Sequence, residues 1–425
     1  MNKRTKLSVA VGAICMVPIT QAIAGIDVNA GDWKIDFSGN VNAFYVATQC
    51  DHPAVGADGV TPTSTAVTGG LACTGDHSAA VRNGLLPAAL VFSATTRQAD
   101  LDIDVTIGFY PGINSSAAAG VNGAGQPAAL STPGIDARQA YFTFGDVSWG
   151  TIKMGRDIGL FGKDAILDDM TLLGVGTSAS TAAPGNTSLG RIGIGYIYTD
   201  WQPQITYTSA SYNGFSGSIG VFQPLTSGVY TSHSSPQIQA GLAYTFGDPK
   251  SDGVSGKVFV DGITQKLRQD TSSIIPGTTA SFNGSGVDGG VKLDFGGFEA
   301  VLYGYTGKGI GTTGFFILAT DAEGQKRKSD GGYVQATYKW DKFKFGLSYG
   351  ESDLKLADGE IQAGNNLVKR NASGVLGVYY SLTKSITLVG EFIDTKSTAW
   401  GSTVPGTTAN SATEKDLAIG GILFF

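Results

Sequence analysis

Apolar and polar residues alternate along this chain in about sixteen stretches, a pattern typical of β-strands whose two faces meet different surroundings. In residues 33–43 the apolar and aromatic side chains fall on one face and the polar side chains on the other. In residues 100–109 the polar face carries Asp100, Asp102 and Asp104 in succession. Three such carboxylates cannot lie in a dry core, so we expect this face to line a wet interior.

The connections between the predicted strands are alternately short and long. Short turns are predicted at 95–97, 145–148, 213–214, 247–253, 296–297, 340–341 and 381–384, and longer Ser-, Thr-, Gly- and Asn-rich loops near residues 60, 120, 175, 230, 275, 317, 360 and 405. An up-and-down sheet has this pattern when its two ends face different compartments. We therefore predict an all-β fold: one transmembrane antiparallel up-and-down β-barrel of about sixteen strands, formed by residues 25–425 as a single domain.

Composition narrows the class of protein. The chain is 42% hydrophobic and only 15% charged, yet after residue 24 no apolar run approaches the ~18 residues that a membrane helix needs. Without the three basic residues at 3, 4 and 6, the chain has 26 basic and 35 acidic residues. This acidic balance argues against nucleic acid as a partner.

Both ends of the chain fit export to a membrane. Residues 1–24 have the order of a cleaved secretory signal: a basic start, a short apolar core and small residues before Gly25. At the other end, alternate residues of 417–425 are apolar or glycine. A terminal strand would be an exposed edge in a soluble protein, so we expect Phe425 to close the barrel by pairing near Trp33–Phe37.

The cysteines predict a disulfide. Cys15 lies in the predicted signal, which leaves Cys50 and Cys73 in the first long loop. His52 and His77 lie nearby, but the spacing lacks the paired close ligands of a zinc site. In an exported chain an even number of cysteines favours a bridge between Cys50 and Cys73 over a metal site.

The third long connection, from Arg156 to about Gly190, is unusually apolar for a surface loop. We expect its apolar residues to pack against the inside of the barrel wall, so that the loop folds into the lumen and narrows it. Those residues are Ile158, Leu160, Phe161, Ile166, Leu167, Met170, Leu172 and Leu173. The same fold would place four carboxylates along the constriction, namely Asp157, Asp164, Asp168 and Asp169.

Two runs in the middle of the chain resemble a known family. Residues 136–145, with the letters DARQAYFTFG, and 149–156, with WGTIKMGR, are similar to the fourth and fifth strands of the general porins of Gram-negative outer membranes. The motif resemblance covers mainly residues 136–170 and the last strand, while the architecture agrees over the whole chain. It implies a sixteen-stranded barrel in the outer membrane, usually a homotrimer surrounded by lipid, that passes small hydrophilic solutes and ions by diffusion.

The resemblance also implies basic residues on the wall opposite the constriction loop. Arg138 matches the arginine of its strand motif, Arg191 resembles the one just after the loop, and Arg82 resembles the one that opens the second strand. Arginine and aspartate facing each other across a narrow lumen would create a transverse field, and rings of such charges set ion preference.

Other functions are less well supported. His233 stands in a Ser-rich loop and no motif places a carboxylate beside it, so we do not expect an enzyme. A G-x-G-x-x-G match at 309–314 is followed by neither a helix nor a βαβ unit, and no cofactor is expected. Two alternatives stay open: a substrate-selective channel with a binding track in the pore, and a plugged adhesin or receptor barrel that acts through its loops.

Overall fold

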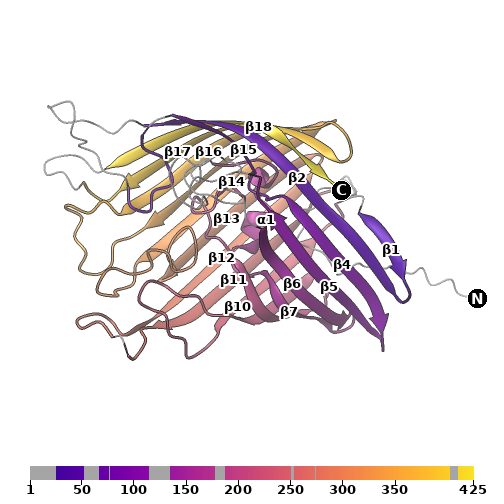
Figure 1. The fold of residues 1–425 in the computed structure, drawn as a ribbon, viewed down its shortest axis with the longest axis horizontal. Helices are drawn as coiled ribbons and strands as arrows, with labels where there is room; N and C mark the ends of the chain where they lie inside the picture. Colours follow the sequence, from indigo (N-terminus) through magenta and orange to yellow (C-terminus); the bar gives the residue numbers. More distant parts are fainter. Residues whose placement is uncertain are drawn as a thin grey trace, which may run out of the picture.

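The computed structural model is one antiparallel β-barrel (Figure 1). It describes residues 25–51, 67–75, 77–113, 135–177, 187–249, 253–272, 274–402 and 410–425. The predicted signal, 1–24, and His52 lie outside these residues. In the part of the chain so described, no helix combines the length and apolarity needed to cross a membrane.

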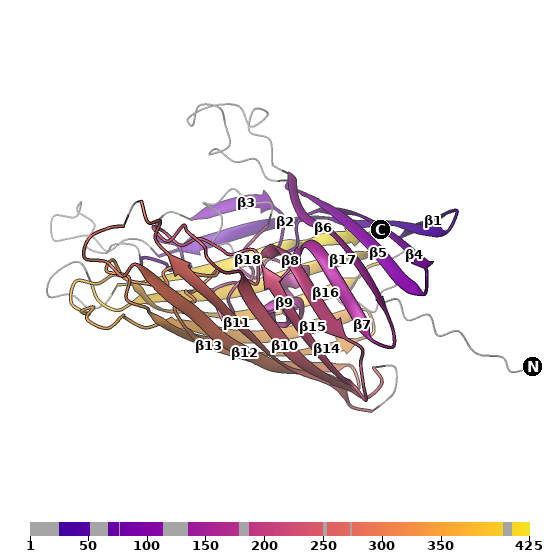
Figure 2. The same cartoon turned by 90° about the horizontal axis from the view of Figure 1, so that it is seen from below.

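Neighbouring strands along the chain pair with each other, except that β3 and β4 both pair with β2, and the last strand, β18, also pairs with β2. Figure 2 shows the long loops gathered at one end of the barrel and the short turns at the other. The wall strands are β2 (Trp33–Cys50), β3 (Ser78–Arg82), β4 (Ala89–Gln98), β5 (Leu101–Pro111), β6 (Ile135–Asp146), β7 (Gly150–Ile158), β8 (Trp201–Ser209), β9 (Phe215–Phe222), β10 (Gln237–Phe246), β11 (Ser255–Arg268), β12 (Ser281–Phe295), β13 (Phe298–Lys308), β14 (Lys328–Trp340), β15 (Phe343–Leu354), β16 (Val368–Ser381), β17 (Ile386–Ala399) and β18 (Ser411–Phe424).

The predicted count of sixteen strands is confirmed. The sheet has eighteen strand segments, but β3 and β4 both pair with β2 and form one wall strand, interrupted at residues 83–88. The remaining segment, β1 (Ile26–Ala30), pairs only with β2 and prolongs the line of β18 beyond the chain terminus. The barrel wall is therefore closed by sixteen antiparallel strands.

Barrel closure by the C-terminal strand is observed, but the predicted register is wrong. The backbone N–H of Phe425 donates to the carbonyl of Gly39, and the Gly39 N–H donates back. Trp33–Phe37 is occupied instead by β1, which folds back through a turn at Gly31. Because β1 already covers that edge of β2, the terminal strand pairs with the stretch that follows.

The strands alternate inward-facing and outward-facing side chains, as the sequence predicts. On β13, Leu302 is 62% exposed and points outward, whereas its neighbours Val301 and Tyr303 are buried inside. On β5, Asp102 and Asp104 share the inner face with the buried Thr106. One turn is displaced from its prediction, because β4 continues past residues 95–97.

Candidate functional site

A long connection between β7 and β8 enters the lumen. We call its described residues, 159–177 and 187–200, the inner loop. The inner loop contains α1 (Lys163–Leu167) and the 3-10 helix Met170–Leu173. In Figure 1, α1 lies within the outline of the barrel. Gly162 precedes α1 with a φ of 77°, which only glycine adopts readily. Its N–H donates to Asp288 on β12 at 2.7 Å, so the helix begins against the wall.

Polar side chains of the inner wall hold the first part of the inner loop. Gln239 on β10 accepts the backbone N–H groups of Leu160 and Phe161 at 2.7 and 2.9 Å. Gln335 on β14 accepts the Met170 N–H at 2.7 Å and donates to the Asp168 carbonyl at 2.9 Å. These bonds satisfy loop backbone groups that would otherwise be buried without partners.

The inner loop then crosses to the other side of the barrel. Glu391 on β17 accepts the N–H groups of Val175 and Gly176 at 2.7 and 3.0 Å. The interruption between β3 and β4 bends toward the same place, and the Leu85 N–H donates to the Gly174 carbonyl at 2.8 Å. The loop is thus bound to opposite walls of one lumen.

Apolar packing accounts for the hydrophobic character of the inner loop. Phe161, Tyr196 and Ile197 have no exposed surface and belong to one cluster with inward-facing residues of β11 to β14, such as Phe259 and Tyr303. The predicted inward fold of this loop is confirmed.

Two carboxylates of the inner loop pair with lysines of the wall. Lys257 on β11 lies 2.5 Å from Asp164, and Lys292 on β12 lies 3.2 Å from Asp168. Burial opposes ionisation of Asp164, but Lys163 and Lys257 outweigh it and lower the pKa of that carboxyl. Burial raises the pKa of Asp168, an effect that Lys292 only partly offsets.

The other two predicted carboxylates are buried. Asp169 accepts hydrogen bonds from the Thr171 N–H and the Tyr196 hydroxyl, each at 2.9 Å. Burial raises the pKa of Asp169, and the positive charge of Arg191 offsets only part of this increase. Asp157 is fully buried at the end of β7, where it accepts from Gln139 at 3.0 Å and pairs with Lys153.

The three predicted arginines have different partners. Arg191 is fully buried; it donates to the Ser348 hydroxyl at 3.0 Å, and burial lowers its pKa. Arg82 is also buried and donates to the Thr187 carbonyl at 2.8 Å. Arg138 pairs with Asp136 at 3.0 Å, and its guanidinium lies 5.5 Å from the ring centre of Tyr110 (the latter on β5).

Sequence reasoning missed the lysines that pair with the inner loop. Within the described residues, neither Arg82 nor Arg138 makes an ion pair with a carboxylate of 159–177, and only Arg191 acts on one of them, Asp169, through its charge. Lys257 and Lys292 stand directly opposite each other on β11 and β12. Their inward position was readable from strand alternation, since each alternates with outward apolar residues.

The first long loop also turns into the barrel mouth. Cys50 and Cys73 form a disulfide, with their Cα atoms 5.2 Å apart. In the same loop, the Leu71 N–H donates to the Ser397 hydroxyl at 2.9 Å, and the Cys73 N–H donates to the Glu414 carboxylate at 2.8 Å. Both acceptors face inward on β17 and β18, so residues 67–75 cover part of the mouth. Among the described residues no group of three or more potential ligands could hold a metal ion.

Comparison with known proteins agrees with this geometry. A family model described as Gram-negative porin matches residues 10–399. The outer membrane channel DcaP of Acinetobacter baumannii has a TM-score of 0.60 and 14% identity, covering 93% of this chain and 99% of its own. OmpT of Vibrio cholerae and OmpF of Salmonella typhi each have a TM-score of 0.55 and 14% identity, covering 94% of this chain and 100% of their own. At such identities the likeness to these structures shows the fold, and no curated protein sequence matches the chain.

Proposed function

Because this chain belongs to the Gram-negative porin family, we propose that it passes small hydrophilic solutes and ions past a constriction made by residues 159–177. Its general function follows from the family: an outer-membrane channel for passive diffusion. The observation that carries the finer proposal is the binding of this segment to opposite walls of the lumen, through Gln239 on β10 and Glu391 on β17.

Charge at the constriction sets which solutes pass. Asp164 and Asp168 carry negative charge on the inner loop, and Lys257 and Lys292 carry positive charge on the wall that they face. An ion crossing beside these pairs meets both signs at close range, and polar solutes exchange hydrogen bonds with water for bonds with the lining. An apolar solute displaces the same water without replacing those bonds.

Neutralising one member of a pair tests this role. Lys257→Gln should shift selectivity toward cations, because the Asp164 carboxylate then stands without its counter-charge, and Asp164→Asn should shift it toward anions. One unit charge changes the energy of an ion about 4 Å away by about 1 kcal/mol in water, with opposite sign for cations and anions, so their permeability ratio should change by up to about 30-fold. The measurement is the reversal potential of single channels in a planar bilayer under a salt gradient.

The matched control is Lys266→Gln. Lys266 lies on the same strand, β11, but faces outward, and charges more than about 10 Å from the path are largely screened at 0.1 M salt. It should leave the reversal potential unchanged. Equal reversal potentials for native protein, Lys257→Gln and Asp164→Asn, with channels still formed, would place the constriction elsewhere.

The predicted arginines belong to the same proposal. Arg138 keeps 15% of its side chain exposed, whereas Arg82 and Arg191 are buried. Arg138→Gln should therefore move selectivity toward cations more than a neutral substitution of either buried arginine. Equal shifts from all three substitutions would argue against a distinct contribution from Arg138.

A substrate-selective channel is the second candidate. The segment 187–200 packs with Phe315 and Phe316, from the loop between β13 and β14, in the same apolar cluster, so the lumen is more filled than one loop alone would make it. Saturable block of the single-channel current by one solute would favour this alternative, and current proportional to solute concentration would favour general diffusion.

Assembly and processing complete the proposal. A homotrimer is supported by the family and by a related structure described as the trimer form of OmpT; light scattering of the detergent-solubilised protein measures the state. Residues 1–24 act as a cleaved signal, so the mature protein should begin at Gly25 on N-terminal sequencing. No catalytic role is included in the proposal.

A further inference from the structure

Two carboxylates of the barrel wall face each other beside the start of α1. Asp261 of β11 is the direct register partner of Asp288 of β12, and both side chains point into the lumen. Only 9% of Asp261 and 3% of Asp288 is exposed. Side chains of directly opposed residues lie about 5 Å apart, so two negative charges there repel each other strongly when they are buried.

The structure gives these two carboxylates few partners. Asp288 accepts hydrogen bonds through one oxygen, Oδ2, from the Gly162 N–H and the Tyr303 hydroxyl, each at 2.7 Å. Its other oxygen, Oδ1, is buried without a hydrogen-bond partner, as is Oδ2 of Asp261. In the described part of the chain, the Asp261 carboxylate makes neither a hydrogen bond nor an ion pair. A buried ionised carboxylate without a partner is costly, so this pair needs a positive charge between its members.

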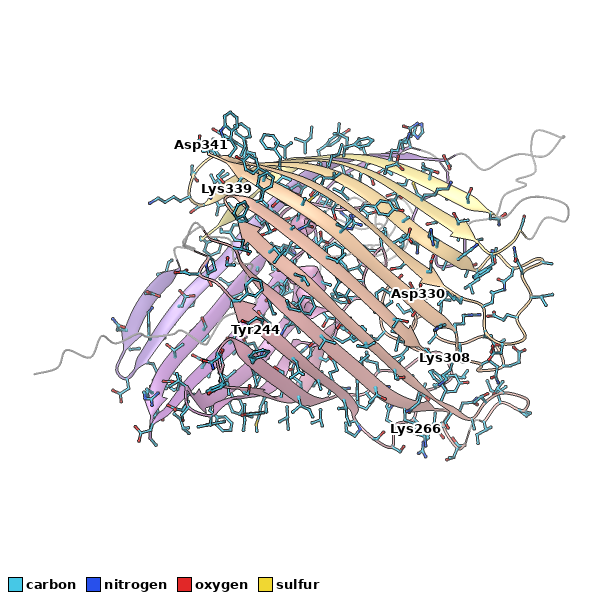
Figure 3. All side chains as sticks on the ribbon, turned by 180° about the vertical axis from the view of Figure 1, so that it is seen from behind. Tyr244, Lys266, Lys308, Asp330, Lys339 and Asp341 are labelled. Carbon is cyan, nitrogen blue, oxygen red and sulfur yellow. A yellow bond between two sulfur atoms is a disulfide. The ribbon has the colours of Figure 1, made fainter. Side chains whose placement is uncertain are left out.

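The pair lies at mid-height in the wall and has room on one side. Figure 3 shows Tyr244 of β10 toward the turn end and Lys266 of β11 toward the long-loop end. On β11, Asp261 lies between Lys266 and Val258, the register partner of Tyr244. The Asp261 carboxylate leans over Gly241 of β10, where an added Cβ would collide with its Oδ1. Glycine at position 241 therefore leaves the space that this carboxylate occupies.

The charges around the pair leave one negative charge unbalanced. The charges that act on Asp261 are those of two further carboxylates and two ammonium groups, on Asp164, Asp288, Lys163 and Lys257. With Asp261 itself, three negative and two positive charges give a net charge of −1. Lys257 is already paired with Asp164, and within the described residues neither lysine lies within ion-pair distance of Asp261 or Asp288. One small monovalent cation would balance the group.

We propose that Asp261 and Asp288 form a binding site for one small monovalent cation, such as potassium, that enters from the lumen. Hard cations take oxygen ligands and can keep part of their water shell, so two carboxylates suffice where a zinc site needs more protein ligands. The cation removes the repulsion between the carboxylates and keeps Asp288 as the acceptor for the Gly162 N–H. It thereby stabilises the attachment of α1 to β12.

The test uses the full purified chain in neutral detergent, with rubidium as the probe because it resembles potassium and scatters X-rays anomalously. Crystals of the native protein in rubidium chloride should show an anomalous peak between the two carboxylates, and crystals of Asp261→Asn should not. In solution, replacing choline chloride by rubidium chloride at equal ionic strength should raise the midpoint of thermal unfolding. Asp261→Asn should need at least about fivefold more rubidium for half of this effect, because it removes a unit charge about 4 Å from the ion.

Two further variants separate the site from general charge. Gly241→Ala leaves every charge in place but crowds the Asp261 carboxylate, so it should weaken rubidium binding as Asp261→Asn does. The matched control is Asp104→Asn, which removes an inward carboxylate of β5 that has a partner, since the Thr143 hydroxyl donates to it at 3.1 Å. This control should keep the native rubidium dependence to within about twofold, because distant charges are screened.

Three results would overturn the proposal. The first is a native crystal without an anomalous peak between the carboxylates. The second is an equal loss of rubidium dependence in Asp261→Asn and Asp104→Asn, which would show only general charge. The third is an unfolding midpoint that depends on pH and not on rubidium, which would assign a shared proton to the pair. A rubidium peak in a channel whose selectivity ignores Lys257→Gln would leave this site intact, so it fails separately from the proposed function.

Discussion

At the scale of single residues, one buried carboxylate holds the far end of the inner loop. Glu391 is 1% exposed and accepts three hydrogen bonds, from the N–H groups of Val175 and Gly176 and from the Tyr379 hydroxyl at 2.9 Å. Gly174 lies so close that an added Cβ would be 2.1 Å from the carboxylate. Close approach, and not a turn, therefore requires glycine at this position.

Replacing Glu391 should release this end of the inner loop. Glu391→Ala leaves three donors without their acceptor, and each buried unpaired group costs about 1–3 kcal/mol. We expect a lower midpoint of denaturant unfolding and larger fluctuations of the open-channel current, measured in a planar bilayer. Tyr379→Phe removes a single donor and should change both quantities only slightly. Native stability and native current noise in Glu391→Ala would show that this anchor does not hold the loop.

At the scale of elements, a loop that folds into the barrel must be attached to the barrel wall. Residues 67–75 of the first long loop are held by the disulfide and by wall side chains, since Ser397 and Asn371 accept the Leu71 N–H and Glu414 accepts the Cys73 N–H. The bridge closes a loop with a sequence separation of 23. In the chain-entropy account such a loop contributes about 3 kcal/mol.

Removal of the bridge should open the mouth. In Cys50→Ser, Cys73→Ser, residues 67–75 lose their covalent constraint, so we expect a higher single-channel current and faster proteolysis of the first loop. Reduction of the native protein should reproduce both effects. Two free thiols in native protein that has been denatured without reductant would contradict the bridge itself.

At the scale of the whole molecule, barrel closure depends on β18 and not on β1. β18 pairs with β2 from Asn40 to Cys50, whereas all five residues of β1 are exposed and pair with one neighbour only. Strands that close a barrel remove its edges, and an added edge hairpin does not.

Two deletions should therefore behave oppositely. Removing residues 26–32 should leave a folded barrel with native conductance, because β2 keeps β4 and β18 as partners. Removing residues 417–425 should prevent closure, because β2 and β17 each lose a neighbour. Both are measured on protein refolded into detergent, by electrophoretic mobility with and without heating and by bilayer recording. Native mobility and conductance after the second deletion would refute this account of closure.

Much of this molecule could be predicted from the sequence. The alternation in residues 100–109 places Asp102 and Asp104 on the wet face, because successive side chains of a strand always point to opposite sides. The apolar residues of the inner loop predict its burial for a similarly local reason. Exposing side chains such as Phe161 and Ile166 to water is unfavourable, and both are buried.

Only the tertiary structure decided which charges meet. Between β5 and β6 the register shifts at Gly108, so Arg138 has no partner on β5 and pairs with Asp136 instead of the inner loop. Asp164 meets Lys257, a residue 93 positions away. Local alternation fixes the face of a side chain, but its partner depends on strand register and on the path of a loop across the barrel, and both are set by contacts between distant parts of the chain.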